Sequence, residues 1–95
     1  SKNPMQMAED FILRQNYPNP FNSTTRIEYD LPRPAWVQMT IYSLTGQPVA
    51  MLVDERQSAG SHMVHFDATR LAAGIYTCRM VADGWIEQKK MLYLK

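Results

Sequence analysis

Apolar and polar residues alternate along most of this chain, and that period of two favours extended strands over helices. The clearest run is TTRIEYDL, residues 24–31, in which Ile27, Tyr29 and Leu31 share one face of the expected strand. Further segments with strand character are expected at 36–44, 49–53, 61–66, 74–82 and 85–95. A chain with this pattern must bury one face of each strand against a second layer of structure.

Turn residues separate these segments. Asp83-Gly84 stands between the last two strands, and this pair suits a two-residue hairpin turn in which both central residues need a positive φ. Thr45-Gly46 and Ser58-Ala59-Gly60 are expected to form turns, and Asp54-Glu55 to lie in a loop. Residues 67–74 are the one helix-like piece, a single turn that Asp67 caps and Gly74 ends.

Six or seven short strands with frequent turns predict an all-β fold, an antiparallel Ig-like β-sandwich of about seven strands. One local detail supports this fold: Tyr76 precedes Cys78 by two residues, as in the tyrosine corner of Ig-like domains. Cys78 is the single cysteine, so no internal disulfide can form, and it is expected to be a small buried apolar residue.

The size and charge of the chain exclude several classes of protein. A length of 95 residues fits one small domain, with residues 1–10 expected to be a linker from a preceding domain and residues 11–95 the folded part. Ten basic and nine acidic residues leave a net charge of +1, which predicts no nucleic-acid partner. No apolar run approaches the roughly 18 residues that a membrane span needs, and residues 1–10 lack the features of a signal peptide.

The polar residues do not form the pattern of a catalytic site. His62 and His65 are three apart on an expected strand, so they face opposite sides of the sheet and cannot share a metal ion. Glu28 and Asp30 share a face, about 7 Å apart, but Arg26 lies on the same face, which indicates a solvated charged surface. The serines lack the glycines of a nucleophile elbow. The sequence therefore predicts neither an enzyme nor a bound cofactor.

Aromatic residues leave a second function open. Trp36 and Tyr42 fall on the polar side of their strand, and Trp85, Met91 and Tyr93 share one face of the last strand. Exposed on a sheet, coplanar rings such as Trp85 and Tyr93 would bind sugars; buried, they would belong to the core. The exposed arrangement would make the chain a carbohydrate-binding or interaction module attached to a secreted hydrolase.

The segment QNYPNPFN, residues 15–22, is unlike the rest of the chain. Its two prolines fix their own φ and exclude the preceding residues from the α region, so the segment is extended and pre-ordered. Its asparagines can bond to nearby backbone, but neutral amides alone are poor calcium ligands. Tyr17 and Phe21 are expected to anchor the segment on the sandwich. The elbow, as we call it, consists of Asn16, Tyr17, Pro18, Asn19, Pro20, Phe21 and Asn22.

Several spaced motifs carry a resemblance to a known family. LRQNYPNPFNSTTRIEYDLP, VQMTIYSLTGQPVAMLV, AGSHMVHFDATRLAAGIYTCRM and the closing KKMLYLK occur in this order. From about Phe11 to Lys95 the chain resembles the type A C-terminal sorting domain of cargo proteins of the type IX secretion system. It is also similar to the Ig-like domain of flagellar hook-capping proteins.

The resemblance assigns roles to particular residues. The elbow matches the asparagine-proline motif of the family, Tyr42 and Gly46 match a turn, and Gly74-Ile75-Tyr76 matches a Gly-x-Tyr motif. The recognition signal that the resemblance implies is Lys89, Lys90, Met91, Leu92, Leu94 and Lys95. The chain departs from the family pattern at Ser23, Ala35 and Ser43, where a proline, a glycine and an acidic or amide residue are usual.

The resemblance implies an address label for export. The attached cargo would pass through the periplasm, be recognised by the outer-membrane translocon through this domain, and reach the cell surface or the medium. A sortase-like protease would then remove the domain and attach the cargo to the surface.

The last strand is expected to lie at a sheet edge, where a partner can add a strand and where Lys89 or Lys90 would discourage unwanted pairing. Deleting residues 89–95 is expected to leave a fused reporter in the periplasm. Exposed edges also allow a homodimer of the isolated domain.

Overall fold

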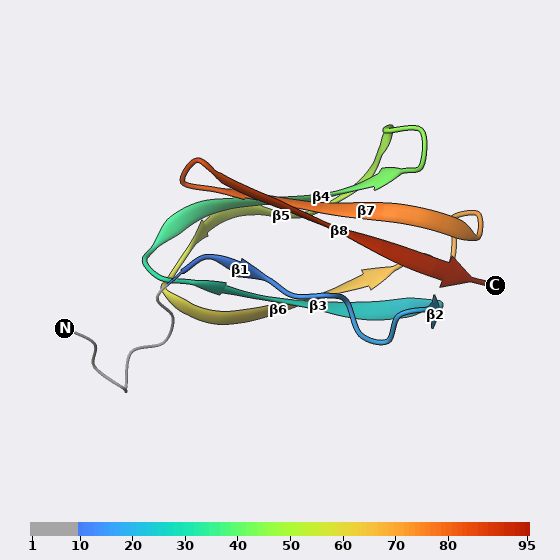
Figure 1. Ribbon diagram of the computed structural model, residues 1–95, viewed down its shortest axis with the longest axis horizontal. Helices are drawn as coiled ribbons and strands as arrows, with labels where there is room; N and C mark the ends of the chain where they lie inside the picture. Colours follow the sequence, from blue (N-terminus) through green and yellow to red (C-terminus); the bar gives the residue numbers. More distant parts are fainter. Residues whose placement is uncertain (1–9) are drawn as a thin grey trace.

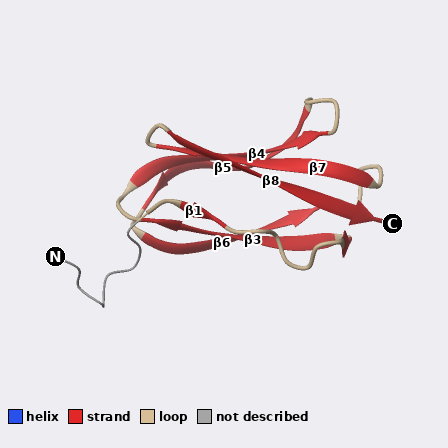
Figure 2. Cartoon of the chain, viewed as in Figure 1, coloured by secondary structure: helices blue, strands red, loops and turns tan. Residues whose placement is uncertain are grey.

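The computed structural model describes residues 10–95, and these form strands and turns without a helix (Figure 2). The eight strands are β1 (Ile12–Leu13), β2 (Phe21–Asn22), β3 (Thr24–Leu31), β4 (Ala35–Ser43), β5 (Pro48–Gln57), β6 (Gly60–Asp67), β7 (Gly74–Ala82) and β8 (Trp85–Leu94). The expected linker, residues 1–10, lies outside the described residues except for Asp10.

The strands form two sheets that pack face to face (Figure 1). One sheet has the order β1-β3-β6, and the other has the order β2-β8-β7-β4-β5. The predicted all-β Ig-like sandwich is therefore confirmed. It differs in two details: the described part has eight strands, and β2 runs parallel to β8 while every other pair is antiparallel. β1 and β2 are two residues long, too short to show a period in the sequence.

Alternating residues of both sheets fill the space between them. Ile27, Tyr29 and Leu31 point inward from β3, as the alternation predicted, and are almost completely buried. The fully buried side chains of greatest volume include Tyr29, Phe21, Phe66, Ile27, Leu31, Met39, Ile41, Met80, Met91 and Val37. The core runs the length of the sandwich and is built largely from aliphatic, methionine and aromatic side chains. The hydroxyl of the buried Tyr29 donates to Gln57 Oε1.

The expected loop at Asp54-Glu55 is wrong, because β5 continues through these residues to Gln57. Glu55 pairs with Val37 and Arg56 with Trp36 on β4. β5 is an edge strand of its sheet, so one margin and one face are in water and charged residues fit there at little cost. The polar composition that indicated a loop is the composition of an exposed strand edge.

The helical turn expected at residues 67–74 is also wrong, although its first contact is present. The Thr69 N–H donates to Asp67 Oδ1 over 3.0 Å, and the Leu71 N–H donates to the Ala68 carbonyl over 2.9 Å. These bonds close a turn between β6 and β7 and do not continue as a helix. The Thr69 hydroxyl also donates to Asp67 Oδ1, over 2.8 Å. The two bonds from Thr69, that of the N–H first, lower the pKa of the Asp67 carboxyl below its ordinary value.

Two local predictions are confirmed around β7. The Tyr76 hydroxyl donates to the Ala72 carbonyl, four residues upstream, which is the contact of a tyrosine corner. Asp83 and Gly84 have φ values of 51° and 82°, as a two-residue hairpin turn between β7 and β8 requires. Gly46, in the turn after β4, has a φ of 89°, which favours glycine over residues with a side chain.

Candidate functional site

The C-terminal strand, β8, presents two different faces. Met91 and Tyr93 are 1% and 3% exposed and point into the core. Lys90 and Leu94 are exposed on the opposite face, and Leu92 is half-buried there. Met91 therefore contributes packing, whereas the other side chains of the expected recognition signal reach solvent fully or in part.

The alternative of a sugar-binding surface required Trp85 and Tyr93 to lie exposed in one plane. The structure does not have this arrangement, because Tyr93 is buried against Phe21, with ring centroids 5.3 Å apart. Trp85 is half-buried and stacks on Phe11 at 5.5 Å. Both rings are occupied by neighbouring rings of the same chain, so they do not offer a flat surface to a sugar.

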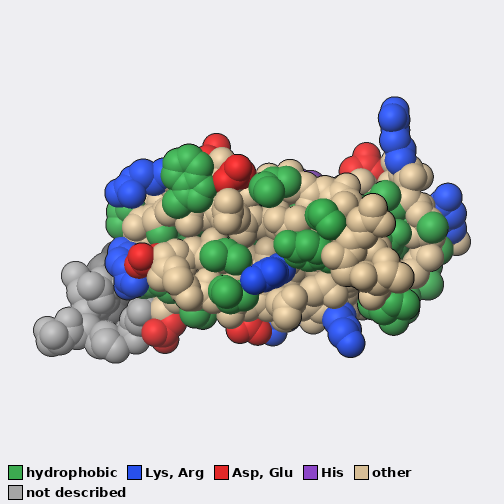
Figure 3. All heavy atoms as spheres, turned by 90° about the horizontal axis from the view of Figure 1, so that it is seen from above, with side chains coloured by type: hydrophobic (Ala, Val, Ile, Leu, Met, Phe, Trp, Pro, Cys, Tyr) green, Lys and Arg blue, Asp and Glu red, His purple; other side chains and the backbone are tan. Residues whose placement is uncertain are grey.

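The outer face of the five-stranded sheet carries apolar side chains that are scattered among polar ones (Figure 3). Ile75 on β7 lies beside Leu92 in the register of the sheet, and Ile75 and Leu94 are 41% and 44% exposed. These three side chains lie near the end of β8, with Lys90 next to them along the strand. The face combines apolar and basic groups at the C-terminal end.

The outer margin of β8 is only partly free. β2 pairs with β8 at two positions, Phe21 with Tyr93 and Asn22 with Leu94. The side chains of Gln15 and of two elbow residues bond to the backbone of β8 over residues 90–94. Gln15 Nε2 donates to the Lys90 carbonyl (2.7 Å), and Asn22 Nδ2 donates to the Leu94 carbonyl (3.2 Å). The Leu92 N–H donates to Asn19 Oδ1 (3.0 Å). The expectation of an open edge therefore holds for the first half of β8 but not for its end.

The two expected anchors of the elbow behave differently. Phe21 is 1% exposed and packs against Tyr93 and Phe66, with the second pair of ring centroids 6.1 Å apart. Tyr17 is 66% exposed, so its ring does not enter the core, but its backbone exchanges two hydrogen bonds with Arg26 of β3, of 2.9 and 3.0 Å, which attach the elbow to the sandwich as expected. Its ring instead lies 5.2 Å from the Arg26 guanidinium, a cation–π contact at the surface.

Asn16 is the buried hydrogen-bonding centre of the elbow, with 3% of its surface exposed. Its Nδ2 donates to the Pro18 carbonyl (3.1 Å) and to Thr25 Oγ1 (3.0 Å), and its Oδ1 accepts from Gln15 Nε2 (2.7 Å). Thr25 belongs to β3, in the other sheet. A continuous polar network thus connects β3 to the end of β8 through the elbow.

The sequence did not single out Gln15, because an amide gives no sign of the backbone that it will contact. The run of amides in QNYPNPFN was the available signal, and it led to an expectation of bonds to nearby backbone. Asn16 fulfils that expectation, while Asn19 and Asn22 bond to residues more than 70 positions away.

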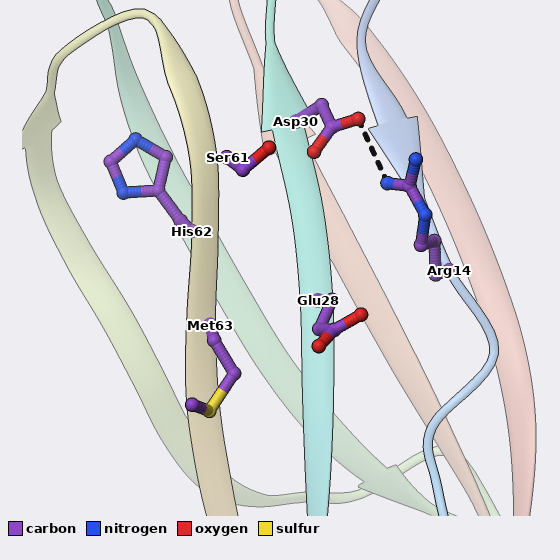
Figure 4. Close-up of a pocket in the computed structure, with 6 residues that line it drawn as sticks. All are labelled: Arg14, Glu28, Asp30, Ser61, His62 and Met63. Atoms are coloured by element: carbon purple, nitrogen blue, oxygen red, sulfur yellow. Dashed lines mark hydrogen bonds and ion pairs between the residues drawn. The ribbon is translucent and has the colours of Figure 1, made fainter.

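A shallow hollow on the outer face of the three-stranded sheet is the other polar surface (Figure 4). Arg14 and Asp30 form an ion pair of 2.9 Å there, and Glu28 lies on the same face, 3.7 Å from the Arg26 guanidinium. Each carboxylate thus has a basic neighbour. Arg14, Arg26 and Glu28 are exposed, as the expected solvated charged face requires, whereas Asp30 is only 8% exposed and departs from that expectation. Within residues 10–95, no group of three or more His, Cys, Asp or Glu side chains could hold a metal ion.

The two histidines lie on opposite faces of β6, as their spacing predicted. His62 stacks on Tyr29 with ring centroids 5.3 Å apart, and its Nε2 lies 2.8 Å from the Ser58 carbonyl. His65 is exposed on the other face.

Cys78 is buried in the core, and burial raises the pKa of its thiol to about 12. Because the thiolate is the reactive form, we expect a thiol reagent at pH 8 to modify the folded domain at least about 100-fold more slowly than the domain unfolded in urea. A colorimetric thiol assay measures both rates, with the unfolded chain as the control. Equal rates would contradict a buried, protonated thiol.

The two ends of β8 lie beside two different parts of the N-terminal segment (Figure 1). Trp85 contacts Phe11, where the described chain enters the sandwich, and Tyr93 contacts Phe21 in the elbow. Trp85 and Tyr93 are eight positions apart on β8, a distance of about 27 Å along the strand. The point where the chain enters and the point where it ends are therefore at opposite ends of the domain.

Comparisons with known proteins identify the family. Residues 15–93 match the family described as the secretion system C-terminal sorting domain. No curated protein matched the chain, and no solved structure did so either. The part of the chain that the structure describes contains no helix long and apolar enough to cross a membrane. Since the match spans nearly the whole length, the chain belongs to the family of secretion system C-terminal sorting domains, the sorting signals of type IX secretion.

Proposed function

We propose that the secretion system recognises this domain through the exposed side chains of its C-terminal segment, residues 89–95. Membership of the family implies a cargo protein on the N-terminal side, interaction with the secretion system, and export to the cell surface or the medium. The family is not a catalytic one, and the domain acts as a label for its cargo. The observation that carries the proposal is the mixed apolar and basic surface at the end of β8.

The position of this surface supports the proposal. The chain enters the sandwich beside Trp85, and the C-terminal segment lies at the far end of the same strand. A cargo attached at the entry point therefore leaves the far end accessible to a partner. Lys90, Leu92, Leu94 and Lys95 offer both apolar area and charge, the combination that gives affinity and orientation in protein interfaces.

The proposed route of export has three steps. The cargo crosses the periplasm with this domain attached, the outer-membrane translocon binds the C-terminal segment, and a sortase-like protease removes the domain when the cargo is fixed to the surface. The isolated domain has unpaired margins on β5 and β6, where a second copy can pair.

Deleting residues 89–95 is not a clean test, because it removes the buried Met91 and Tyr93 together with the exposed residues. We expect the double variant Leu92→Gln, Leu94→Gln to keep the fold and to lower the secreted fraction of a fused reporter about tenfold, which corresponds to a loss of about 1.4 kcal/mol in partner binding. Fractionation of cells and medium measures the secreted fraction.

Met51→Gln is the matched control for this variant. Met51 is 55% exposed and lies on β5, at the opposite margin of the same sheet. We expect normal secretion from the control. If the double variant retains its thermal midpoint and is secreted as well as the unchanged domain, the C-terminal side chains are not the recognised surface.

A further inference from the structure

The end of β8 is a strand whose outer margin lacks a neighbouring strand of matching length. β2 covers only Tyr93 and Leu94 there, while β7 pairs with all of β8 from Trp85 to Tyr93 on the other margin. A terminal strand held on one side only is prone to fray or to pair with other chains. The structure must therefore hold residues 90–94 by other means.

Three side-chain amides take the place of the missing strand, and we call Gln15, Asn19 and Asn22 the edge amides. They contact Lys90, Leu92 and Leu94, every second residue along β8. Backbone groups that face one margin of a strand recur every two residues, so the edge amides follow the spacing of a sheet ladder. Two of them donate to carbonyls and one accepts from an N–H, as the backbone groups require.

Two of the edge amides, Gln15 and Asn22, are themselves held in place. Gln15 Nε2 donates both to the Lys90 carbonyl and to Oδ1 of the buried Asn16. Asn22 belongs to β2, whose other residue, Phe21, is buried in the core. A side chain held by buried neighbours can keep its partner in one position at little further entropic cost.

We infer that the edge amides are positioning residues of the sorting signal, an inference that rests on the function proposed above. They hold residues 90–94 as a regular strand, so that Lys90, Leu92 and Leu94 point from one face at a fixed spacing. Because the edge amides occupy the outer margin, a partner meets these side chains and not a free backbone edge. The elbow thus determines the shape of a surface that lies at the other end of the sequence.

A pair of isosteric variants tests this role. In Asn19→Asp the side chain keeps the oxygen that accepts from the Leu92 N–H, so we expect secretion close to normal. In Asn22→Asp the donor to the Leu94 carbonyl becomes an acceptor, and two oxygens face each other. We expect the secreted fraction of a fused reporter to fall about fivefold to tenfold. Both variants add one negative charge, so charge alone cannot separate them.

The second readout is amide hydrogen exchange of the purified domain, followed by NMR. In Asn19→Ala we expect the Leu92 amide to exchange about fivefold to tenfold faster, while amides in β4 and β7 keep their rates. The secreted fraction of a fused reporter should fall in the same variant. Tyr17→Ala is the control, because Tyr17 lies in the same elbow, is 66% exposed and has its ring on Arg26.

Three outcomes would overturn the inference. An unchanged Leu92 exchange rate in Asn19→Ala would mean that the contact does not hold the strand. Faster exchange with normal secretion would mean that order in residues 90–94 is not needed for recognition. Increased secretion would mean that a partner strand competes for the same margin. If instead Leu92→Gln, Leu94→Gln is secreted normally, the proposed function fails while the exchange result still measures the contact.

Discussion

Replacing Phe21 with alanine should lower the free energy of unfolding by about 3 to 5 kcal/mol. The ring is 1% exposed and lies between Tyr93 and Phe66, so its removal leaves a cavity that joins the elbow, β8 and β6. A domain of this size has a total stability of roughly 5 to 15 kcal/mol. Urea titration followed by tryptophan fluorescence measures the change.

Tyr17→Ala is the control for Phe21→Ala, because it truncates an aromatic ring in the same elbow. Tyr17 is 66% exposed and contacts the Arg26 guanidinium, a contact of about 0.5 to 1 kcal/mol at exposed sites. If Phe21→Ala is too unstable to titrate, Phe21→Leu leaves a smaller cavity and should fall between the two. Equal losses of unfolding free energy in Phe21→Ala and Tyr17→Ala would contradict the placement of the elbow.

The second large effect is expected at Met39. This side chain is 0% exposed, and its strand, β4, lies between β7 and β5, where Met39 pairs with Met80 and Val53. We expect Met39→Ala to lower the free energy of unfolding by about 2 to 5 kcal/mol. The same urea titration measures it.

Met51→Ala provides the comparison, since Met51 lies on the adjacent strand β5 and is 55% exposed. A surface substitution of this kind should change stability by no more than about 0.5 kcal/mol. Comparable losses at the two methionines would contradict the assignment of inner and outer faces in the larger sheet.

Both large effects concern a core that the domain builds from its own residues. A core built from both sheets makes the domain independent of what precedes it, and the buried Cys78 is not engaged in a disulfide. The C-terminal segment is part of this core through Met91 and Tyr93. The surface that we propose for recognition is therefore expected to exist only when the whole domain is folded, so an unfolded domain would fail to present it.

The sequence by itself determined the features that depend on residues close together in the chain. Alternation placed Ile27 and Leu31 inside because a strand turns successive side chains to opposite faces. Asp83-Gly84 predicted its hairpin turn because the positive φ values are a property of those two residues. The spacing of Tyr76 and Cys78 predicted the tyrosine corner because its hydrogen bond joins Tyr76 to the Ala72 carbonyl, only four residues upstream.

The tertiary structure alone decided what depends on residues far apart. Asp54-Glu55 is strand and not loop because β4 offers a pairing partner and the edge position leaves the charges in water. Phe21 is buried and Tyr17 is exposed, although each stands beside a proline in the same elbow. The elbow amides reach β8 across more than 70 residues. The local sequence pattern determines which face of a strand a side chain lies on. Which residue that side chain contacts depends on how the two sheets pack, and the period of the sequence contains no information about this packing.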